Sequence, residues 1–138
     1  KLPAASRKAL MEGIESTKSN TRMTLVLALN YSSRWEIVQA SRHIAEDVQQ
    51  GKLDPATIDE EVFSQYLSTR NIPDPELLIR TSGEQRISNY LLWQIAYAEL
   101  YFTEVFWPDF KKKNLLEAIL DYQKRERRFG KTSEQLVS

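Results

Sequence analysis

Residues 77–90 read Leu-Leu-Ile-Arg-Thr-Ser-Gly-Glu-Gln-Arg-Ile-Ser-Asn-Tyr, a short apolar run followed by a polar loop. The apolar run predicts a buried strand, because unbroken apolar stretches of this length are typical of parallel sheets. Arg80 and Arg86 add forked guanidinium donors, and Ser88 adds a hydroxyl. These groups suit phosphate oxygens, and a Ser82–Gly83 turn can bring backbone N–H groups close to a ligand. The stretch therefore indicates an anion site at the end of a strand.

The composition sets broad limits on the class of protein. With 138 residues and 41% hydrophobic content, the chain is expected to form a single domain, residues 1–138. Its 19 basic and 19 acidic residues cancel, so nucleic acid is not an expected partner and anion binding must be local. The absence of cysteine excludes disulfides and thiolate metal sites. No apolar run approaches the roughly 18 to 20 residues of a transmembrane helix, and no signal-peptide pattern is present, so we expect a cytoplasmic protein.

Upstream of this stretch, helix and strand patterns alternate. Residues 4–18 show helical spacing, and the almost unbroken apolar run at 23–29 predicts another buried strand. A helix is expected from residue 33 until Gly51, with Ser33 and Glu36 forming a capping box. A turn capped by Asp54, then a helix over 58–67, complete this half of the chain.

Downstream, residues 88–100 predict a mainly apolar helix that begins at Ser88. A third strand is expected at 101–106, and a last helix begins near residue 115 and becomes strongly basic over 124–128. Strands that alternate with helices predict an α/β fold, a parallel sheet with helices on both faces. Three strands are few for such a sheet, which suggests that part of the fold is missing or supplied by a partner.

Three blocks of the sequence resemble, in matching order, those of the cis-prenyltransferases, and among them the bacterial undecaprenyl diphosphate synthases. Residues 79–94 and 107–110 look like the C-terminal motif block of that family. Residues 30–36, Asn-Tyr-Ser-Ser-Arg-Trp-Glu, and residues 125–130, Arg-Glu-Arg-Arg-Phe-Gly, match two further blocks. The resemblance runs from about residue 23 to residue 130, and it implies the C-terminal portion of the cis-prenyltransferase fold.

The resemblance implies a reaction and its site residues. Isopentenyl diphosphate would be added repeatedly to an allylic diphosphate such as farnesyl diphosphate, giving a long-chain cis-polyprenyl diphosphate such as undecaprenyl diphosphate, the precursor of the lipid carrier of cell-wall synthesis. By motif match, Arg80, Arg86 and Ser88 are expected to hold the diphosphate of isopentenyl diphosphate, and Glu99 is expected to help place Mg²⁺; these four are the expected catalytic residues. The family also implies a homodimer in which Arg128 reaches the partner's diphosphate site, and a transient contact with a membrane surface when the product is released.

The family's first block, which contains Asp-Gly-Asn-Gly-Arg-Trp, is absent from this sequence. The middle region that supplies part of the hydrophobic tunnel, and so limits product length, is absent as well. The chain is therefore expected to be the C-terminal part of an enzyme. We expect it to lack turnover by itself, because Glu99 lacks its partner aspartate and the allylic diphosphate lacks its binding loop.

Milder departures from the family pattern keep small or polar side chains, so the reaction class is expected to persist. They are Ser32, Ser33 and Ser82 in place of common glycines, Gln85 in place of a frequent histidine, and Glu36 in place of the usual aspartate. Gln85 brings no titratable group to the diphosphate site.

Other readings compete with this one. Ser88 is equally well explained as a helix N-cap, and Arg128 as part of a solvated basic helix end. A non-catalytic partner subunit would use this half of the fold for dimerisation, although the joint presence of Arg80, Arg86, Ser88 and Glu99 argues against it. A simpler anion-binding or nucleic-acid-binding module is disfavoured by the zero net charge.

Overall fold

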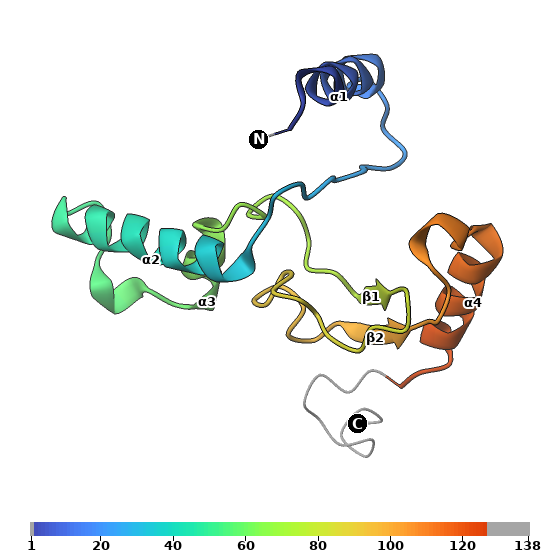
Figure 1. The fold of residues 1–138 in the computed structure, drawn as a ribbon. Coiled ribbons are helices and arrows are strands. Elements are labelled where there is room, and N and C mark those ends of the chain that lie inside the picture. The colour runs from blue at the N-terminus through green and yellow to red at the C-terminus, as the bar shows by residue number, and fades with distance from the viewer. Residues whose placement is uncertain (1, 127–138) are drawn as a thin grey trace. The chain divides into compact units, whose positions relative to one another are not determined.

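The computed structural model describes residues 2–126, which fall into two units, one up to residue 30 and one from residue 31 onward (Figure 1). In the first unit, α1 spans Ala4–Thr17, as the helical spacing predicts. No residue of α1 is buried. Within residues 2–126, no helix is both long and apolar enough to cross a lipid bilayer.

The strand predicted at residues 23–29 is wrong in this structure. These residues run as irregular chain, and Met23 and Leu25 are 81% and 75% exposed. A strand forms only where a neighbouring strand takes its backbone N–H and C=O groups. The sheet of the described residues contains two strands, β1 and β2, and residues 23–29 are not among them. The apolar run therefore has strand composition without a strand partner.

The second unit begins with α2, Ser33–Gln49, whose buried residues share one face. They are Ser33, Glu36, Ala40 and Ile44. The N-cap is Ser32, whose hydroxyl accepts a hydrogen bond from the backbone N–H of Trp35 at 3.4 Å. The expected capping box at Ser33 and Glu36 is therefore wrong by one residue, and the Glu36 side chain turns inward instead.

Two short helices follow α2. The turn η1, Pro55–Thr57, is capped by Asp54, as predicted. The helix expected over 58–67 is shorter than predicted: α3 spans Glu60–Gln65, and Asp59 accepts a hydrogen bond from the N–H of Val62 at 2.8 Å. Leu67, just beyond α3, is almost completely buried. Contacts between α2 and α3 tie this part of the unit together.

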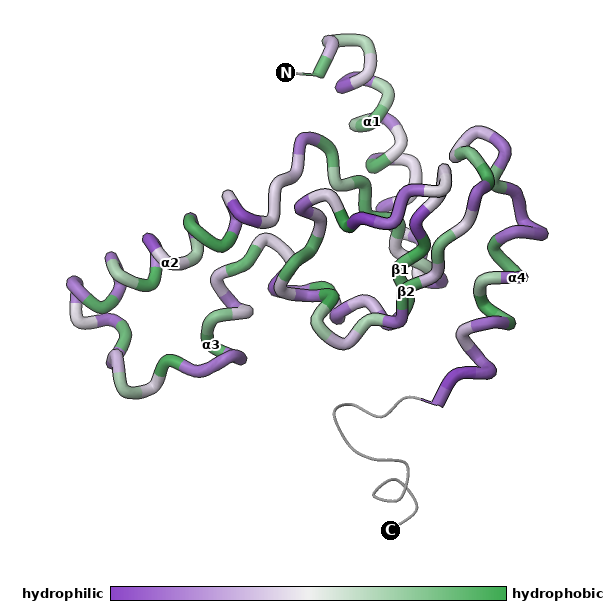
Figure 2. Tube along the Cα trace, turned by 60° about the horizontal axis from the view of Figure 1, so that its bottom comes forward, coloured by the Kyte–Doolittle hydropathy of each residue, from purple (hydrophilic) through white to green (hydrophobic). Residues whose placement is uncertain are grey.

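The sheet pairs β1, Leu77–Arg80, with β2, Glu99–Phe102, in parallel. This confirms the α/β class with a parallel sheet, and the bounds of β1 agree with the apolar run that predicts it. β2 begins two residues before the predicted third strand. In the register, Leu77 lies opposite Glu99 and Arg80 lies opposite Phe102. Figure 2 shows the hydrophobic character of both strands.

The helix predicted over 88–100 is wrong. The chain forms a series of turns here before β2 begins. Ser88, Asn89 and Leu91 have positive φ angles of 48°, 60° and 49°, which a right-handed helix excludes. The final described elements are η2, Trp107–Asp109, and α4, Lys112–Gln123, which contacts β2.

Candidate functional site

Arg80, the last residue of β1, carries an unused buried donor. Its side-chain Nε is buried and has no hydrogen-bond partner. Within residues 2–126, the other buried side-chain atom in this condition is Oε1 of Gln94. A buried donor without an acceptor costs free energy, and a guanidinium favours an anionic acceptor. The carboxyl end of β1 therefore carries a donor, Nε of Arg80, that can bind the oxygen of an anionic ligand.

The backbone amides of Ser82 and Gly83 are already occupied. The N–H of Ser82 donates to the carbonyl of Val105 at 2.9 Å, and that of Gly83 donates to the carbonyl of Thr103 at 2.9 Å. The expectation that these amides approach a ligand is therefore wrong. Instead, they attach the turn after β1 to the chain that follows β2. Gly83 has a φ of 68°, which favours glycine, and a Cβ there would also require the carboxylate of Glu104 to move aside.

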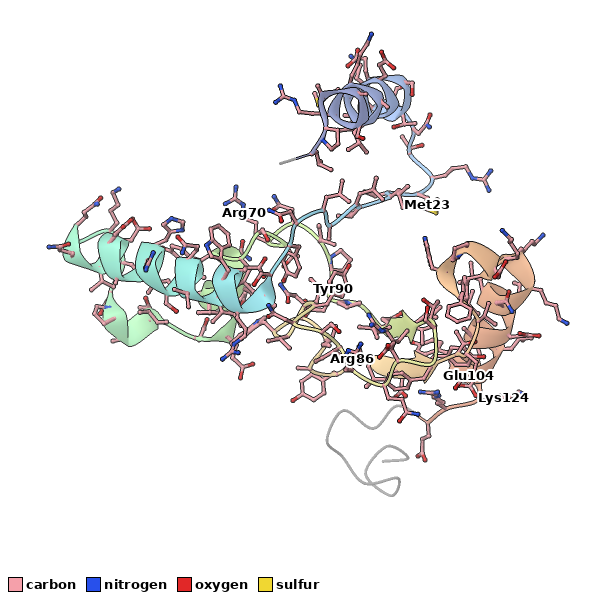
Figure 3. All side chains as sticks on the ribbon, in the orientation of Figure 1. Met23, Arg70, Arg86, Tyr90, Glu104 and Lys124 are labelled. Atoms are coloured by element: carbon pink, nitrogen blue, oxygen red, sulfur yellow. The ribbon has the colours of Figure 1, made fainter. Side chains whose placement is uncertain are left out.

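Arg86 and Ser88 lie on the connection between β1 and β2, where Figure 3 labels Arg86 and Tyr90. The guanidinium of Arg86 is 66% exposed and forms an ion pair with Glu84. An exposed pair of this kind contributes at most about 1 kcal/mol, so a phosphate can replace Glu84 at low cost. Ser88 is exposed and begins no helix, so its expected role as an N-cap is wrong.

A buried polar network lies between α2 and this connection. The carboxyl group of Glu36, which is 4% exposed, accepts hydrogen bonds from the hydroxyl of Tyr31 at 3.1 Å and from Nε2 of Gln94 at 2.8 Å. The hydroxyl of Ser68 is a third donor to Glu36. Nε2 of Gln94 also donates to the hydroxyl of Thr69 at 2.8 Å. The network joins α2, the chain after α3 and the connection before β2.

The spacing of residues in the sequence predicts a buried Glu36 rather than the capping box expected there. Glu36 follows Ser33 by three residues and precedes Ala40 by four, so helical spacing places all three on one face. A carboxylate on a buried face is rare unless hydrogen bonds satisfy it. Burial is also the largest cause that raises the pKa of Tyr31; the charge of Glu36 adds to it, and the hydrogen bond with Ser33 opposes it.

Glu99 is the first residue of β2 and lies opposite Leu77, the first residue of β1. Arg80 ends β1, so along the strands the two residues are separated by roughly 10 Å, at about 3.3 Å per residue. Oε2 of Glu99 accepts a hydrogen bond from Nη1 of Arg125 at 2.9 Å. The structure therefore pairs Glu99 with Arg125 and does not bring it to Arg80.

The guanidinium of Arg125 donates hydrogen bonds to three residues. Besides Glu99, its Nε and Nη2 donate to Oδ2 of Asp121 at 2.9 and 2.6 Å, and its Nη1 donates to the carbonyl of Leu100 at 2.9 Å. These contacts join the end of α4 to the start of β2. They raise the pKa of Arg125, with the hydrogen bond to Glu99 as the largest cause.

Among the described residues, Glu99 fits one carboxylate ligand of a magnesium ion. Across the described range 2–126, no three Asp, Glu or His side chains gather into a group that could hold a metal. Mg²⁺ is commonly bound through one or two carboxylates together with substrate phosphates, and Glu99 offers one such carboxylate. Arg128 lies outside the described residues.

The family whose description is "Putative undecaprenyl diphosphate synthase" matches residues 1–130. The chain is 60% identical over 135 residues to an isoprenyl transferase of Chlorobaculum tepidum, covering 98% of this chain and 51% of that protein. It is 56% identical over 120 residues to the farnesyl-diphosphate-specific ditrans,polycis-undecaprenyl-diphosphate synthase of Vibrio cholerae, covering 87% of this chain and 48% of that protein. The chain thus spans about half the length of the curated relatives it matches.

A solved structure agrees with these matches. Lavandulyl diphosphate synthase from Lavandula x intermedia, solved in complex with dimethylallyl diphosphate, superposes with a TM-score of 0.86 at 43% identity. The match covers 95% of this chain and 56% of that one. The parallel sheet, the motif blocks and the similarity over nearly the whole chain have one explanation: the chain belongs to the cis-prenyltransferase family.

Proposed function

We propose that this chain forms the isopentenyl-diphosphate-binding part of a cis-prenyltransferase. The complete enzyme would extend an allylic diphosphate such as farnesyl diphosphate into a long-chain cis-polyprenyl diphosphate such as undecaprenyl diphosphate. The observation that carries the proposal is the buried, unpaired Nε of Arg80 in a family member. Arg86 and Ser88 follow it on the same connection, and both residues are exposed.

The proposed residues bind and orient the substrate. Arg80 supplies a donor from the end of a paired strand, which fixes one side of the diphosphate. Arg86 exchanges its weak pair with Glu84 for phosphate oxygens, and Ser88 adds a neutral donor. In each cycle, a carbon–carbon bond forms as the double bond of isopentenyl diphosphate attacks the allylic carbon. The diphosphate of the allylic substrate leaves as pyrophosphate with the electron pair of its carbon–oxygen bond. A proton then passes from C2 of the isopentenyl unit to a diphosphate oxygen, and this loss forms the new double bond.

We further propose that the enzyme uses Mg²⁺, with Glu99 as one of its carboxylate ligands. When bound, the ion supplies positive charge that stabilises the departing diphosphate. We infer a cytoplasmic homodimer in which Arg128 reaches the partner's diphosphate site. The apolar product calls for a transient contact with a membrane surface at release.

The isolated chain is proposed to lack turnover. It spans about half the length of its curated relatives, and its sequence lacks the Asp-Gly-Asn-Gly-Arg-Trp block that binds the allylic diphosphate in the family. The experiment therefore uses the full-length protein that contains this chain.

The test measures incorporation of labelled isopentenyl diphosphate onto farnesyl diphosphate by the wild type and by Arg80→Ala and Arg80→Lys. The exposed Arg70, labelled in Figure 3, provides the matched control Arg70→Ala. A hydrogen bond to a charged group contributes about 1.5–3 kcal/mol, so Arg80→Ala should lower kcat/KM for isopentenyl diphosphate about 10- to 100-fold. Arg80→Lys should recover part of this loss.

Wild-type kinetics in Arg80→Ala would contradict the site assignment. A full-length protein that has no turnover alone, yet restores turnover to a separate prenyltransferase chain, would support a non-catalytic partner subunit in its place.

A further inference from the structure

The connection that carries Arg86 and Ser88 has a backbone that ordinary residues disfavour. Ser88, Asn89 and Leu91 have φ angles of 48°, 60° and 49°. Residues with a side chain rarely adopt the left-handed region, and they stay there only where the surroundings hold them. Something outside the connection must therefore fix this conformation.

Asn89 makes three hydrogen bonds, all of them to the start of α2. Its Nδ2 donates to Oγ of Ser32 at 2.9 Å, and its Oδ1 accepts from the backbone N–H of Arg34 at 2.9 Å. Its carbonyl accepts from the N–H of Ser33 at 3.1 Å. Both polar ends of the Asn89 side chain are therefore turned toward α2.

The same contacts complete the N-terminus of α2. A helix leaves its first backbone N–H groups without partners inside the helix. Asn89 accepts from those of Ser33 and Arg34, and Ser32 accepts from that of Trp35. Asn89 thus caps α2 from 55 residues away in the sequence. The helix end and the strained connection stabilise each other.

A second tie lies just beyond the strained residues. The backbone N–H of Leu92 donates to Oγ of Ser33 at 2.9 Å, and Ser33 is fully buried. The chain is therefore attached to α2 at Asn89 and again at Leu92. Ser88 directly precedes the first of these attachments.

We propose that Asn89 is a positioning residue for the candidate diphosphate site. By capping α2, it holds Ser88 and Arg86 in the conformation that receives the diphosphate. This inference rests on the proposed function for the identity of the ligand, isopentenyl diphosphate. Asn89 itself does not contact the substrate, because its side chain is committed to Ser32 and Arg34.

Asparagine at position 89 supplies side-chain hydrogen bonds and tolerates a positive φ. Three substitutions separate these two properties. Asn89→Ala removes both side-chain hydrogen bonds and disfavours the positive φ. Asn89→Gly removes the same two side-chain hydrogen bonds but readily adopts the positive φ. Asn89→Asp keeps an acceptor for the N–H of Arg34 and can accept from the hydroxyl of Ser32, and aspartate is a favoured N-cap.

The experiment uses the full-length protein and measures the Kd of isopentenyl diphosphate by calorimetry, the KM of each substrate, and kcat. We expect Asn89→Ala to weaken the binding of isopentenyl diphosphate at least tenfold, which corresponds to about 1.4 kcal/mol of binding free energy. Asn89→Gly should lie between Ala and wild type, and Asn89→Asp should stay within about threefold of wild type, since it retains the capping acceptor. The KM of farnesyl diphosphate should not change.

The matched control is Asp59→Ala, which removes the N-cap of α3 and should lower Tm without changing the Kd of isopentenyl diphosphate. Unchanged Kd in Asn89→Ala, or equal losses for both substrates, would overturn the positioning role. If Asn89→Ala fails to fold, the contrast between the Gly and Asp variants decides the question. If Arg80→Ala weakens the binding of isopentenyl diphosphate and Asn89→Ala does not, only the positioning role is refuted. If Arg80→Ala leaves this binding unchanged, the proposed function itself is refuted.

Discussion

The chain from Gln94 to Leu100 is held at its two ends by opposite kinds of chemistry. Near α2, the carboxyl group of Glu36 is 4% exposed and its hydrogen-bond partners are neutral. Near α4, the side chain of Arg125 is 31% exposed and its partners include two carboxylates, those of Glu99 and Asp121. Buried hydrogen bonds are costly to leave unmade, whereas exposed charges are hydrated and screened. Burial rather than formal charge should therefore decide which end matters more for stability.

The largest effect is expected for Glu36→Ala. The substitution leaves Gln94, Tyr31 and Ser68 without their common acceptor, and the free energy of unfolding should fall by about 3 kcal/mol. Glu36→Gln, which keeps an acceptor oxygen, should lose less. Urea unfolding of the full-length protein gives both values, with Glu46→Ala on the exposed side of α2 as control. A loss below about 1 kcal/mol would mean that water replaces the buried partners.

A smaller effect, with a different salt dependence, is expected for Arg125→Gln. Removing the guanidinium leaves two carboxylates without their shared cation, and the free energy of unfolding should fall by about 1 kcal/mol at low salt. In 1 M NaCl, where the Debye length is about 3 Å, this loss should shrink while that of Glu36→Ala stays constant. Lys113→Gln, which breaks an exposed pair with Glu117, is the control. Equal salt dependence for Glu36→Ala and Arg125→Gln would remove the distinction between the two ends.

The sequence predicts those elements that depend on nearby residues. The apolar run before Arg80 predicts β1, and the helical spacing after Ser33 predicts α2, because both patterns repeat over a few positions. The apolar run at 23–29 has an equally good strand composition. It fails as a prediction because pairing is decided by a neighbouring strand rather than by the run itself.

The missed features depend on residues that are far apart in the sequence. The apolar spacing after Ser88 suits a helix, but the hydrogen bonds that hold Asn89 come from α2. Likewise, the ion pair of Glu99 with Arg125 joins β2 to the end of α4, and no local sequence pattern predicts this pair. The motif match names Arg80, Arg86 and Ser88, yet only the structure shows that one nitrogen of Arg80 lacks a partner.

The smallest expected effect appears at high pH and again depends on burial. Burial and the charge of Glu36 raise the pKa of Tyr31, so the folded state favours the neutral phenol. The resulting stabilisation is complete below the ordinary pKa, about 10, and is lost as pH rises through the higher pKa of the folded protein. The difference in the free energy of unfolding between wild type and Tyr31→Phe should therefore be constant up to about pH 9 and change in favour of the variant above pH 10. In a Glu36→Gln background this alkaline change should be smaller but still present, because burial is the largest cause of the shift. A difference that moves in favour of the wild type above pH 10 would show that the folded protein favours the ionised phenol.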